Sequence, residues 1–259
     1  MARSGALLTS ALFSPRVGQW EPFHADEAPA DGLFLMERDL ARLLALEGDP
    51  SLGPSLFLYR WAEPTISLGY AQREERVLDE TAVRGARVPV VRRPTGGRAI
   101  LHVDEWTFAA AVAIDHPRLG GSLRDSLAAV AGIVRAALAA TGVRTDAVAR
   151  AGALPSGESR AAQACFDRAL GHEITVDGRK LAGLAQRRLA RALLTQGTIL
   201  AGPGHERLAE LLAGDAGSKR AGRESLAAGT VTALEVGGRA ATFGCFAQAL
   251  RRAWQAAEL

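Results

Sequence analysis

A cysteine and a lysine fifteen residues apart are the first candidates for covalent chemistry in this sequence. Cys165 precedes residues 173–176, where polar and apolar side chains alternate, and Asp177-Gly178 is a strong signal for a two-residue hairpin turn. Lys180 then opens the returning strand, which would hold it on rigid backbone. An ammonium near a thiol lowers the thiol pKa, so Cys165 is a candidate acyl-accepting nucleophile. The alternative is a buried structural cysteine and a solvated lysine, because a free cysteine often simply belongs to a core.

A turn-rich loop, residues 92–98, is the second candidate feature. Gly96 and Gly97 permit positive φ and let backbone N–H groups approach a ligand. The arginines of this loop suit a phosphate or a carboxylate. The loop matches neither of the two common phosphate-binding glycine motifs, and a plain hairpin loop with solvated arginines remains the alternative.

Hydrophobic periodicity predicts the elements that position these residues. Helices are expected over residues 31–47, 72–85, 122–140, 205–212 and from 242 onward, with Asp31 capping the first and Ser122 and Asp125 forming a capping box on the third. Strands are expected over residues 55–61, 65–70, 88–91, 99–102, 106–114, 143–148 and 192–200, besides the hairpin. Residues 150–162 read as a mobile loop and 218–223 as a loose basic segment. The regular strand–helix rhythm of a doubly wound fold is missing, so we predict an α+β fold with a mixed, mostly antiparallel sheet flanked by helices.

Composition narrows the class of protein. Of the 259 residues, 48% are hydrophobic and 23% are charged, which is ordinary for a globular enzyme. Two cysteines cannot supply a disulfide framework, no apolar run approaches a membrane span, and the N-terminus lacks a convincing secretory signal. We therefore expect a cytoplasmic protein without a membrane partner.

Charge points to an acidic partner rather than to nucleic acid. The net charge of +3 comes from scattered arginines without a basic block, and aromatic residues make up only 5%. This gives weak support for nucleic-acid binding, whereas mild basicity suits an acidic protein or a phosphate-bearing substrate. The histidines show no metal-ligand spacing, so we expect no structural metal. Cys245 is expected in the core on the last helix, and we expect a monomer.

Several segments together resemble the lipoate/octanoate attachment family, which is related to biotin protein ligases. They are DGLFLMERDL, LYRWAEPTISLGYAQ, RRPTGGRAILH, GRKLAGLAQRR and QGTIL, and they follow the family's order over roughly residues 31–240. The resemblance implies a fold of the biotin/lipoate ligase catalytic-domain type, with a medium-chain acyl group in a tunnel beside the sheet. It also implies an N-terminal extension (1–30), a catalytic acyl-attachment domain (31–215) and a short C-terminal helical segment (216–259) packed on the same domain.

The resemblance also implies the site. Cys165 and Lys180 would be catalytic, with Lys180 holding the acyl carbonyl or its phosphate. The implied substrate-binding residues are Arg92, Arg93, Thr95, Gly96, Gly97, Arg98, His102, Gly183, Ala185, Gln186, Gln196 and Gly197. Without the resemblance, His102 would read as a structural histidine at a strand end.

Three activities compete within this family: ATP-dependent lipoate ligation, and octanoyl transfer by two branches that place the cysteine differently. The Cys-Phe-Asp run at 165–167, shortly before Gly-Arg-Lys at 178–180, resembles a cysteine/lysine octanoyltransferase branch. This implies transfer of an octanoyl (or lipoyl) group, without a cofactor, from acyl carrier protein through Cys165 to a lysine of a lipoyl-carrier domain such as the glycine cleavage H protein. The alternatives are a lipoate–protein ligase that uses ATP and Mg to form lipoyl-adenylate, and a non-catalytic lipoyl-domain-binding protein.

Three positions depart from the family pattern. Val103 follows His102 where the family commonly has Asp, Gln196 stands where His is usual, and Arg98 replaces the third glycine of the ligase-type loop. These differences affect adenylate handling more than acyl binding.

Overall fold

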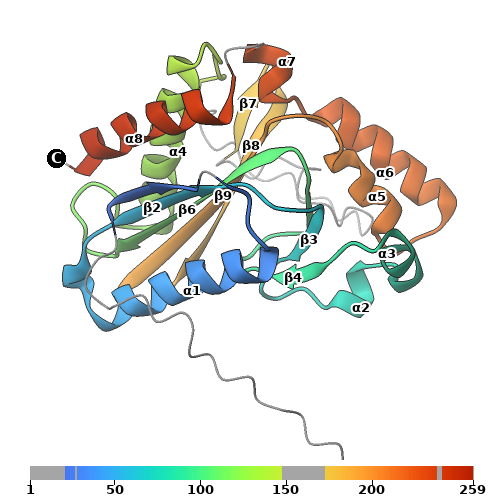
Figure 1. Cartoon of the computed structure of the whole chain (residues 1–259), viewed down its shortest axis with the longest axis horizontal. Helices are drawn as coiled ribbons and strands as arrows, with labels where there is room; N and C mark the ends of the chain where they lie inside the picture. The colour runs from blue at the N-terminus through green and yellow to red at the C-terminus, as the bar shows by residue number, and fades with distance from the viewer. Residues whose placement is uncertain (1–20, 27, 148–172, 238–240, 259) are drawn as a thin grey trace, which may run out of the picture.

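Two sheets form the centre of the molecule in the computed structural model, which describes residues 21–26, 28–147, 173–237 and 241–258 (Figure 1). The larger sheet has the strand order β1-β2-β6-β9-β8-β7 and the smaller one the order β4-β3-β5. Neighbouring strands are antiparallel except for β1–β2 and β3–β4. The strands are β1 (Phe23–Ala25), β2 (Ser55–Tyr59), β3 (Thr65–Leu68), β4 (Val90–Arg92), β5 (Ile100–His102), β6 (Glu105–Ala113), β7 (Ile174–Val176), β8 (Arg179–Arg188) and β9 (Ala192–Leu200). The predicted α+β fold with a mixed, mostly antiparallel sheet is confirmed.

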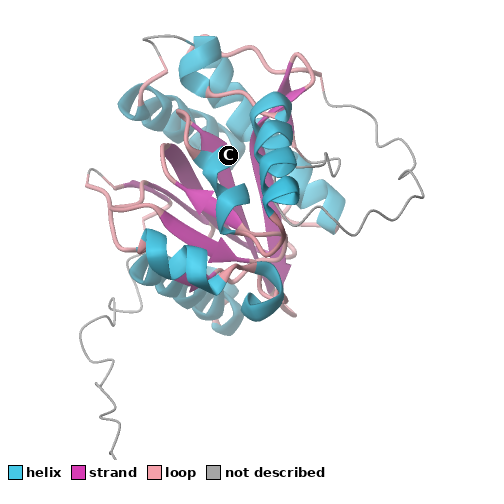
Figure 2. Ribbon diagram, turned by 90° about the vertical axis from the view of Figure 1, so that its right-hand side faces the viewer, coloured by secondary structure: helices cyan, strands magenta, loops and turns pink. Residues whose placement is uncertain are grey.

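The central strands β6 and β9 are buried along their whole length because helices cover both faces of the large sheet (Figure 2). Ala109 and Ala111 of β6 pack with α1 (Gly32–Gly48), whereas Phe108, Ala110 and Val112 pack with α4 (Leu123–Ala140) and α8 (Phe243–Glu258). Alternate residues of a strand point to opposite faces. The alanine-rich sequence of β6 therefore lets helices approach from both sides.

Helix α1 carries two ionisable groups into the protein. Its N-terminus is capped as predicted, since the Asp31 carboxylate accepts hydrogen bonds from the backbone N–H groups of Leu33 and Phe34. Its buried face includes Asp39 and Arg42 as well as the expected leucines. Helix α1 thus places a carboxylate directly against the sheet.

The hairpin that carries Lys180 forms as predicted. Asp177 and Gly178 both adopt positive φ, of 50° and 74°, which the type I′ turn between β7 and β8 requires. Their backbone N–H groups donate to the Asp146 carboxylate at 3.0 Å each. Lys180 is the second residue of β8.

Some predicted elements were wrong. Residues 72–85 form two short helices, α2 (Glu74–Val77) and α3 (Glu80–Ala86), because Leu78 is extended and Asp79 caps a new helix. Residues 143–147 form no strand, while Val148 and the loop 150–162 lie outside the described residues. The expected helix 205–212 is a 3₁₀ turn, His205–Arg207, followed by α5 (Leu208–Leu211).

The C-terminal third also differs from expectation. The segment predicted as loose and basic belongs to helix α6 (Ala216–Gly229), which Asp215 caps, and a short helix α7 (Ala233–Gly237) follows. Helix α8 buries Phe246, Leu250 and Trp254, but Cys245 is exposed and not in the core, because it lies beside this apolar stripe.

The predicted division into three segments stays a prediction. Strand β1, which lies within residues 1–30, pairs with β2, and α8 packs on α4. Among the described residues, no helix combines the length and the apolar character needed to cross a membrane.

Candidate active site

A pocket of about 370 Å³, open to solvent, lies between the two sheets and α1. It brings together part of the predicted substrate-binding set, namely Arg93, Thr95, His102, Gly183, Ala185, Gln196 and Gly197. Arg92, Gly96, Gly97, Arg98 and Gln186 are not among the residues that line it. The pocket has a mixed wall, since apolar side chains such as Met36, Ile100 and Leu184 alternate with hydroxyl and amide groups.

Small residues on β8 and β9 shape one wall. Gly183 pairs with Thr198, and Ala185 pairs with Gln196, so four lining residues come from one stretch of antiparallel ladder. Gly197 has no room for a side chain, because a Cβ there would lie 2.2 Å from the Phe108 ring. Glycine at this position therefore lets the Phe108 ring pack directly against β9.

Lys180 is buried next to this wall, so the alternative of a solvated hairpin lysine is wrong. Its ammonium donates a hydrogen bond to the Glu173 carboxylate, which is also buried. A Cβ at Gly183 would lie 3.1 Å from Cε of Lys180 and 3.2 Å from Nζ. Because Gly183 has no side chain, the end of the Lys180 side chain can lie beside it at the edge of the pocket.

The two arginines at the start of the glycine loop both donate to backbone carbonyls, Arg93 from a buried position and Arg92 from an exposed one. Arg93 donates to the carbonyl of Ser67 and to the carbonyls of Gly96 and Arg98 at 2.7–3.1 Å. Arg92 donates through Nη1 to the carbonyls of residues 69, 70 and 72. Their predicted role toward a ligand stays a prediction, and the hydrogen bonds described here fix the loop.

Glycine is required where this loop meets the turn after β3. Gly97 has a φ of 95°, in the left-handed region. A Cβ at Gly69 would lie 2.0 Å from the carbonyl oxygen of Gly97. The two backbones are therefore in direct contact at this point.

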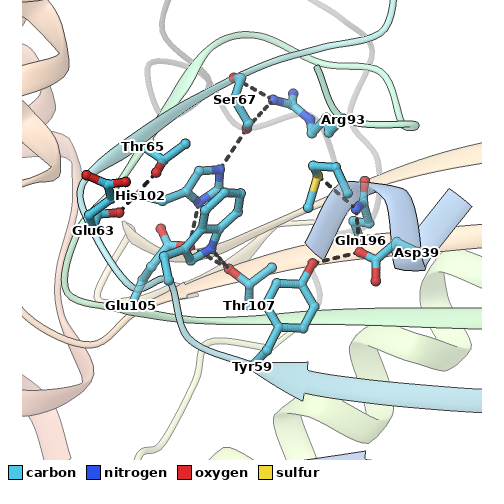
Figure 3. A network of polar contacts seen from close by, with 12 residues as sticks. Asp39, Tyr59, Glu63, Thr65, Ser67, Arg93, His102, Glu105, Thr107 and Gln196 are labelled. Atoms are coloured by element: carbon cyan, nitrogen blue, oxygen red, sulfur yellow. Dashed lines mark hydrogen bonds and ion pairs between the residues drawn. The ribbon is translucent and has the colours of Figure 1, made fainter. Parts of the chain in front are cut away.

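His102 is the centre of a buried polar network (Figure 3). Its Nδ1 lies 2.5 Å from Glu105 Oε1, and its Nε2 lies 2.7 Å from Ser67 Oγ. The imidazole stacks on the indole of Trp61 with the centroids 3.8 Å apart and the planes 10° apart. Thr107 Oγ1 completes the network 2.6 Å from Glu105 Oε1. The histidine expected to line the pocket is there, with both ring nitrogens engaged.

A second network surrounds Asp39 on the opposite side of the pocket (Figure 3). Asp39 Oδ2 accepts hydrogen bonds of 2.7 Å from the Tyr59 hydroxyl and from Gln196 Nε2. Gln196 Oε1 in turn accepts a 2.7 Å hydrogen bond from Thr95 Oγ1. Desolvation raises the pKa of Asp39 to about 6, against the lowering effect of nearby Arg38. Gln196, a departure from the family pattern, thus joins a buried carboxylate to the glycine loop.

Two further predicted residues are placed elsewhere. Gln186 lies on the other face of β8, where it contacts Ser126 of α4 and Thr195. Cys165 lies outside the described residues, so its relation to Lys180 stays a prediction. Within the described residues, no group of three or more His, Cys, Asp or Glu side chains could hold a metal ion.

Ser67, Glu105 and Thr107 around His102, and Asp39 beside Gln196, were not predicted from the sequence. Asp39 had a usable signal, because it lies three residues after Met36 and four before Leu43 on the predicted buried face of a helix. Glu105 and Thr107 had none, since every residue of β6 is buried and the strand shows no alternation.

Comparisons with known proteins agree with this fold. The model of the family described as lipoyl protein ligase A/B catalytic domain matches residues 34–255. The octanoyltransferase LipM of Moorella thermoacetica is 40% identical over 147 residues, which are 57% of this chain and 53% of that protein. The octanoyltransferase LipM of Kyrpidia tusciae is 35% identical over 188 residues, 70% of this chain and 65% of that protein. The chain therefore matches between half and two thirds of the length of these relatives.

Solved structures share the fold at low sequence identity. A bi-partite lipoate protein ligase from Thermoplasma acidophilum has a TM-score of 0.69 at 18% identity, covering 91% of this chain and 82% of that one. A lipoate-protein ligase A bound with ATP has a TM-score of 0.66 at 18% identity, covering 92% and 85%. The fold predicted from the resemblance is confirmed. With the family model matching residues 34–255, the chain belongs to the lipoyl protein ligase A/B catalytic-domain family.

Proposed function

We propose that this chain transfers an octanoyl (or lipoyl) group from acyl carrier protein, through a thioester on Cys165, to a lysine of a lipoyl-carrier domain such as the glycine cleavage H protein. The observation that carries the proposal is Lys180, a buried cation held against Glu173 beside Gly183 in the pocket wall. The similarity to octanoyltransferases supports the acyl group and the type of reaction.

The pocket supports an acyl substrate. Met36, Ile100 and Leu184 offer apolar surface for a hydrocarbon chain, and the small residues of β8 and β9 leave the wall flat. A medium-length chain lying along this wall would have its carbonyl end near Lys180.

The proposed chemistry needs no activated nucleotide. The sulfur of Cys165 bonds to the acyl carbonyl carbon, the C–S bond to the donor breaks, and the donor thiol leaves with a proton. The acceptor lysine then displaces the Cys165 sulfur, which splits one amidation into two easier steps. The fixed ammonium of Lys180 would stabilise the oxyanion in both steps. Because the donor is already a thioester, neither ATP nor Mg is consumed.

One assay with two donors tests this function. A single lipoyl-carrier domain is incubated either with octanoyl carrier protein and no nucleotide, or with free lipoate, ATP and Mg. We expect modification of the acceptor lysine only with the first donor, and loss of that transfer in Cys165→Ala. Modification only with the second donor, at a rate indifferent to Cys165→Ser, would instead identify an ATP-dependent ligase. Tight carrier binding with no turnover from either donor would identify a non-catalytic binding protein.

A further inference from the structure

Two groups that can only donate hydrogen bonds lie at the ends of the network around His102. At one end the indole Nε1 of Trp61, which can only donate, lies 2.8 Å from Thr107 Oγ1. The Thr107 hydroxyl must then give its own proton to Glu105 Oε1. At the other end Arg93 Nη1, also only a donor, lies 3.0 Å from Ser67 Oγ. Donors therefore enter the network from both ends and converge on Glu105.

These contacts place His102 between a hydroxyl group and a carboxylate. Because Glu105 Oε1 is an acceptor for Thr107, the Nδ1 of His102 carries a proton and donates to the same oxygen. Ser67 Oγ accepts from Arg93, and its own proton can be donated to His102 Nε2, 2.7 Å away. A hydroxyl, an imidazole and a carboxylate in this order have the arrangement of a Ser-His-acid triad.

This arrangement faces the substrate pocket. Ser67 and His102 both line it, as does Gly183 beside Lys180. The Trp61 ring that stacks on His102 lies 3.8 Å away, and an indole face stabilises a cation. Glu105 and Trp61 would therefore both favour the imidazolium that forms when His102 takes a proton.

The proposed function needs a proton acceptor that Lys180 does not supply. The acceptor lysine arrives as an ammonium and must lose a proton before its nitrogen can attack a thioester. Lys180 is itself an ammonium paired with Glu173, so it has no lone pair for that proton. A second group at the pocket must take it.

We propose that Ser67, His102 and Glu105 form a proton relay for the amide-forming step, an inference that rests on the proposed function. One ammonium proton of the acceptor lysine passes to Ser67 Oγ as the Ser67 proton passes to His102 Nε2, and Glu105 stabilises the imidazolium. The lysine nitrogen bonds to the octanoyl carbon and the C–S bond of the enzyme thioester breaks. A second proton goes to the departing sulfur, and the third stays on the amide nitrogen. Ser67 is the catalytic residue that contacts the amine, while Glu105 is a positioning residue.

Other ionisable groups face the His102–Glu105 pair from neighbouring elements. Arg93 faces it through Ser67. His205 interacts with Glu105 from the 3₁₀ turn, and its burial lowers its pKa. Tyr59 on β2 interacts with Glu105 as well, and burial raises its pKa well above the usual value. Histidine 205 and Tyr59 are both neutral near pH 7.

The test separates the two steps in the full chain. The enzyme is loaded with octanoyl carrier protein, loading is measured by mass spectrometry, and amide formation is then followed in a single turnover with a lipoyl-carrier domain. Ser67→Ala and Glu105→Gln should load at about the wild-type rate but form amide about 10²-fold more slowly, the lower end for general acid–base catalysis.

Ser55→Ala is the matched control. Ser55 is a fully buried strand serine that accepts a 2.7 Å hydrogen bond from Arg42 Nε, as Ser67 does from Arg93, but it does not line the pocket. It should lose stability without slowing either step. If Ser67→Ala and Glu105→Gln behave like Ser55→Ala, or slow loading as much as amide formation, the relay is wrong. An octanoyl ester found on Ser67 would also overturn it. Failure of the wild type to load would contradict the proposed function, whereas normal amide formation by loaded Ser67→Ala contradicts the relay alone.

Discussion

Two buried carboxylates next to the same pocket, Glu105 and Asp39, are held in different ways. Glu105 accepts from His102, a side chain that can take up a charge, and from Thr107. Asp39 accepts from Tyr59 and Gln196, two neutral donors, and burial raises its pKa to about 6. The two acids are both fully enclosed, so the difference lies in their partners and not in their exposure.

This difference separates a reactive side of the pocket from an anchoring side. Glu105 and His102, with Lys180 at the β8 wall, hold groups that can carry protons or charge during a reaction. Thr95 donates a hydrogen bond to Gln196, and Gln196 donates one to Asp39. These hydrogen bonds attach the glycine loop to β9 and α1. Changes on the reactive side should therefore affect turnover, and changes on the anchoring side should affect stability and substrate affinity.

The largest effect is expected at Lys180. Both Lys180→Ala and Lys180→Arg should slow acyl transfer by at least about 10²-fold, since loss of one oxyanion-directed donor typically costs about 10²–10³ in rate, roughly 3–4 kcal/mol. Lys180→Arg keeps a cation opposite Glu173 and should fold normally, although its planar fork cannot replace a compact ammonium. Transfer rates and thermal unfolding measured on both variants check this. A Lys180→Arg protein with near wild-type transfer would place the reactive side elsewhere.

The next effect is expected at Asp39, in stability. Its folded pKa of about 6 exceeds the ordinary value of 3.8, so the folded state binds the proton more tightly than the unfolded state does. The contribution of Asp39 to stability is therefore fully present below about pH 4. It is lost as the pH rises through about 6, by roughly 3 kcal/mol in all. Asp39→Asn keeps an oxygen for Tyr59 and Gln196 and should remove this pH dependence, which makes it more stable than wild type at pH 7.

Urea unfolding of wild type and Asp39→Asn at several pH values measures the effect of Asp39. Transfer by Asp39→Asn should stay near the wild-type rate, because the anchoring hydrogen bonds persist. If it instead loses turnover as Lys180→Ala does, the division between the two sides is wrong.

A smaller effect is expected at Gln196. Gln196→Leu leaves the Thr95 hydroxyl and the Asp39 carboxylate without their amide partner, which should cost about 1–3 kcal/mol of stability. The substitution loosens the glycine loop but removes no reacting group. KM should therefore rise more than kcat falls. A double-mutant cycle with Thr95→Val checks that the two residues act together, since additive losses would show no coupling.

The smallest effect is expected at Gly183. Its Cβ in Gly183→Ala would lie 3.2 Å from Lys180 Nζ, so the lysine tip must shift by a few tenths of an ångström. We expect transfer to fall about tenfold, because displacements of about 1 Å at a site can cost about 10²-fold. Gly132→Ala on α4, where the added Cβ meets nothing within 4 Å, is the control and should transfer at the wild-type rate. Equal rates for both variants would show that the position of Lys180 is not critical.

Local signals explain what the sequence predicted well. The Asp177-Gly178 turn, the Asp31 cap and the long apolar runs of β6 and β9 each follow from neighbouring residues alone, and all form as expected. The break at Leu78 and the helix over 216–229 were missed, because caps by Asp79 and Asp215 override weak hydrophobic patterns.

The candidate site was predicted in part because its contacts join distant segments. Thr95 and Gln196 are 101 residues apart, and Ser67 and His102 are 35 apart. Family resemblance named His102, Thr95 and Gln196 but not their partners Ser67, Glu105 and Asp39. Periodicity cannot pair a serine on β3 with a glutamate on β6. Glu173, predicted only as part of a strand, proved to be the partner of Lys180.

The most direct test of the central proposal is the mass of the enzyme after incubation with octanoyl carrier protein and no acceptor. The wild type should gain one octanoyl group without ATP, and peptide mapping should place it on Cys165. Cys165→Ala should gain none. An unmodified wild-type enzyme that transfers octanoyl groups at full rate, or a Cys165→Ala protein that retains full transfer, would contradict the account.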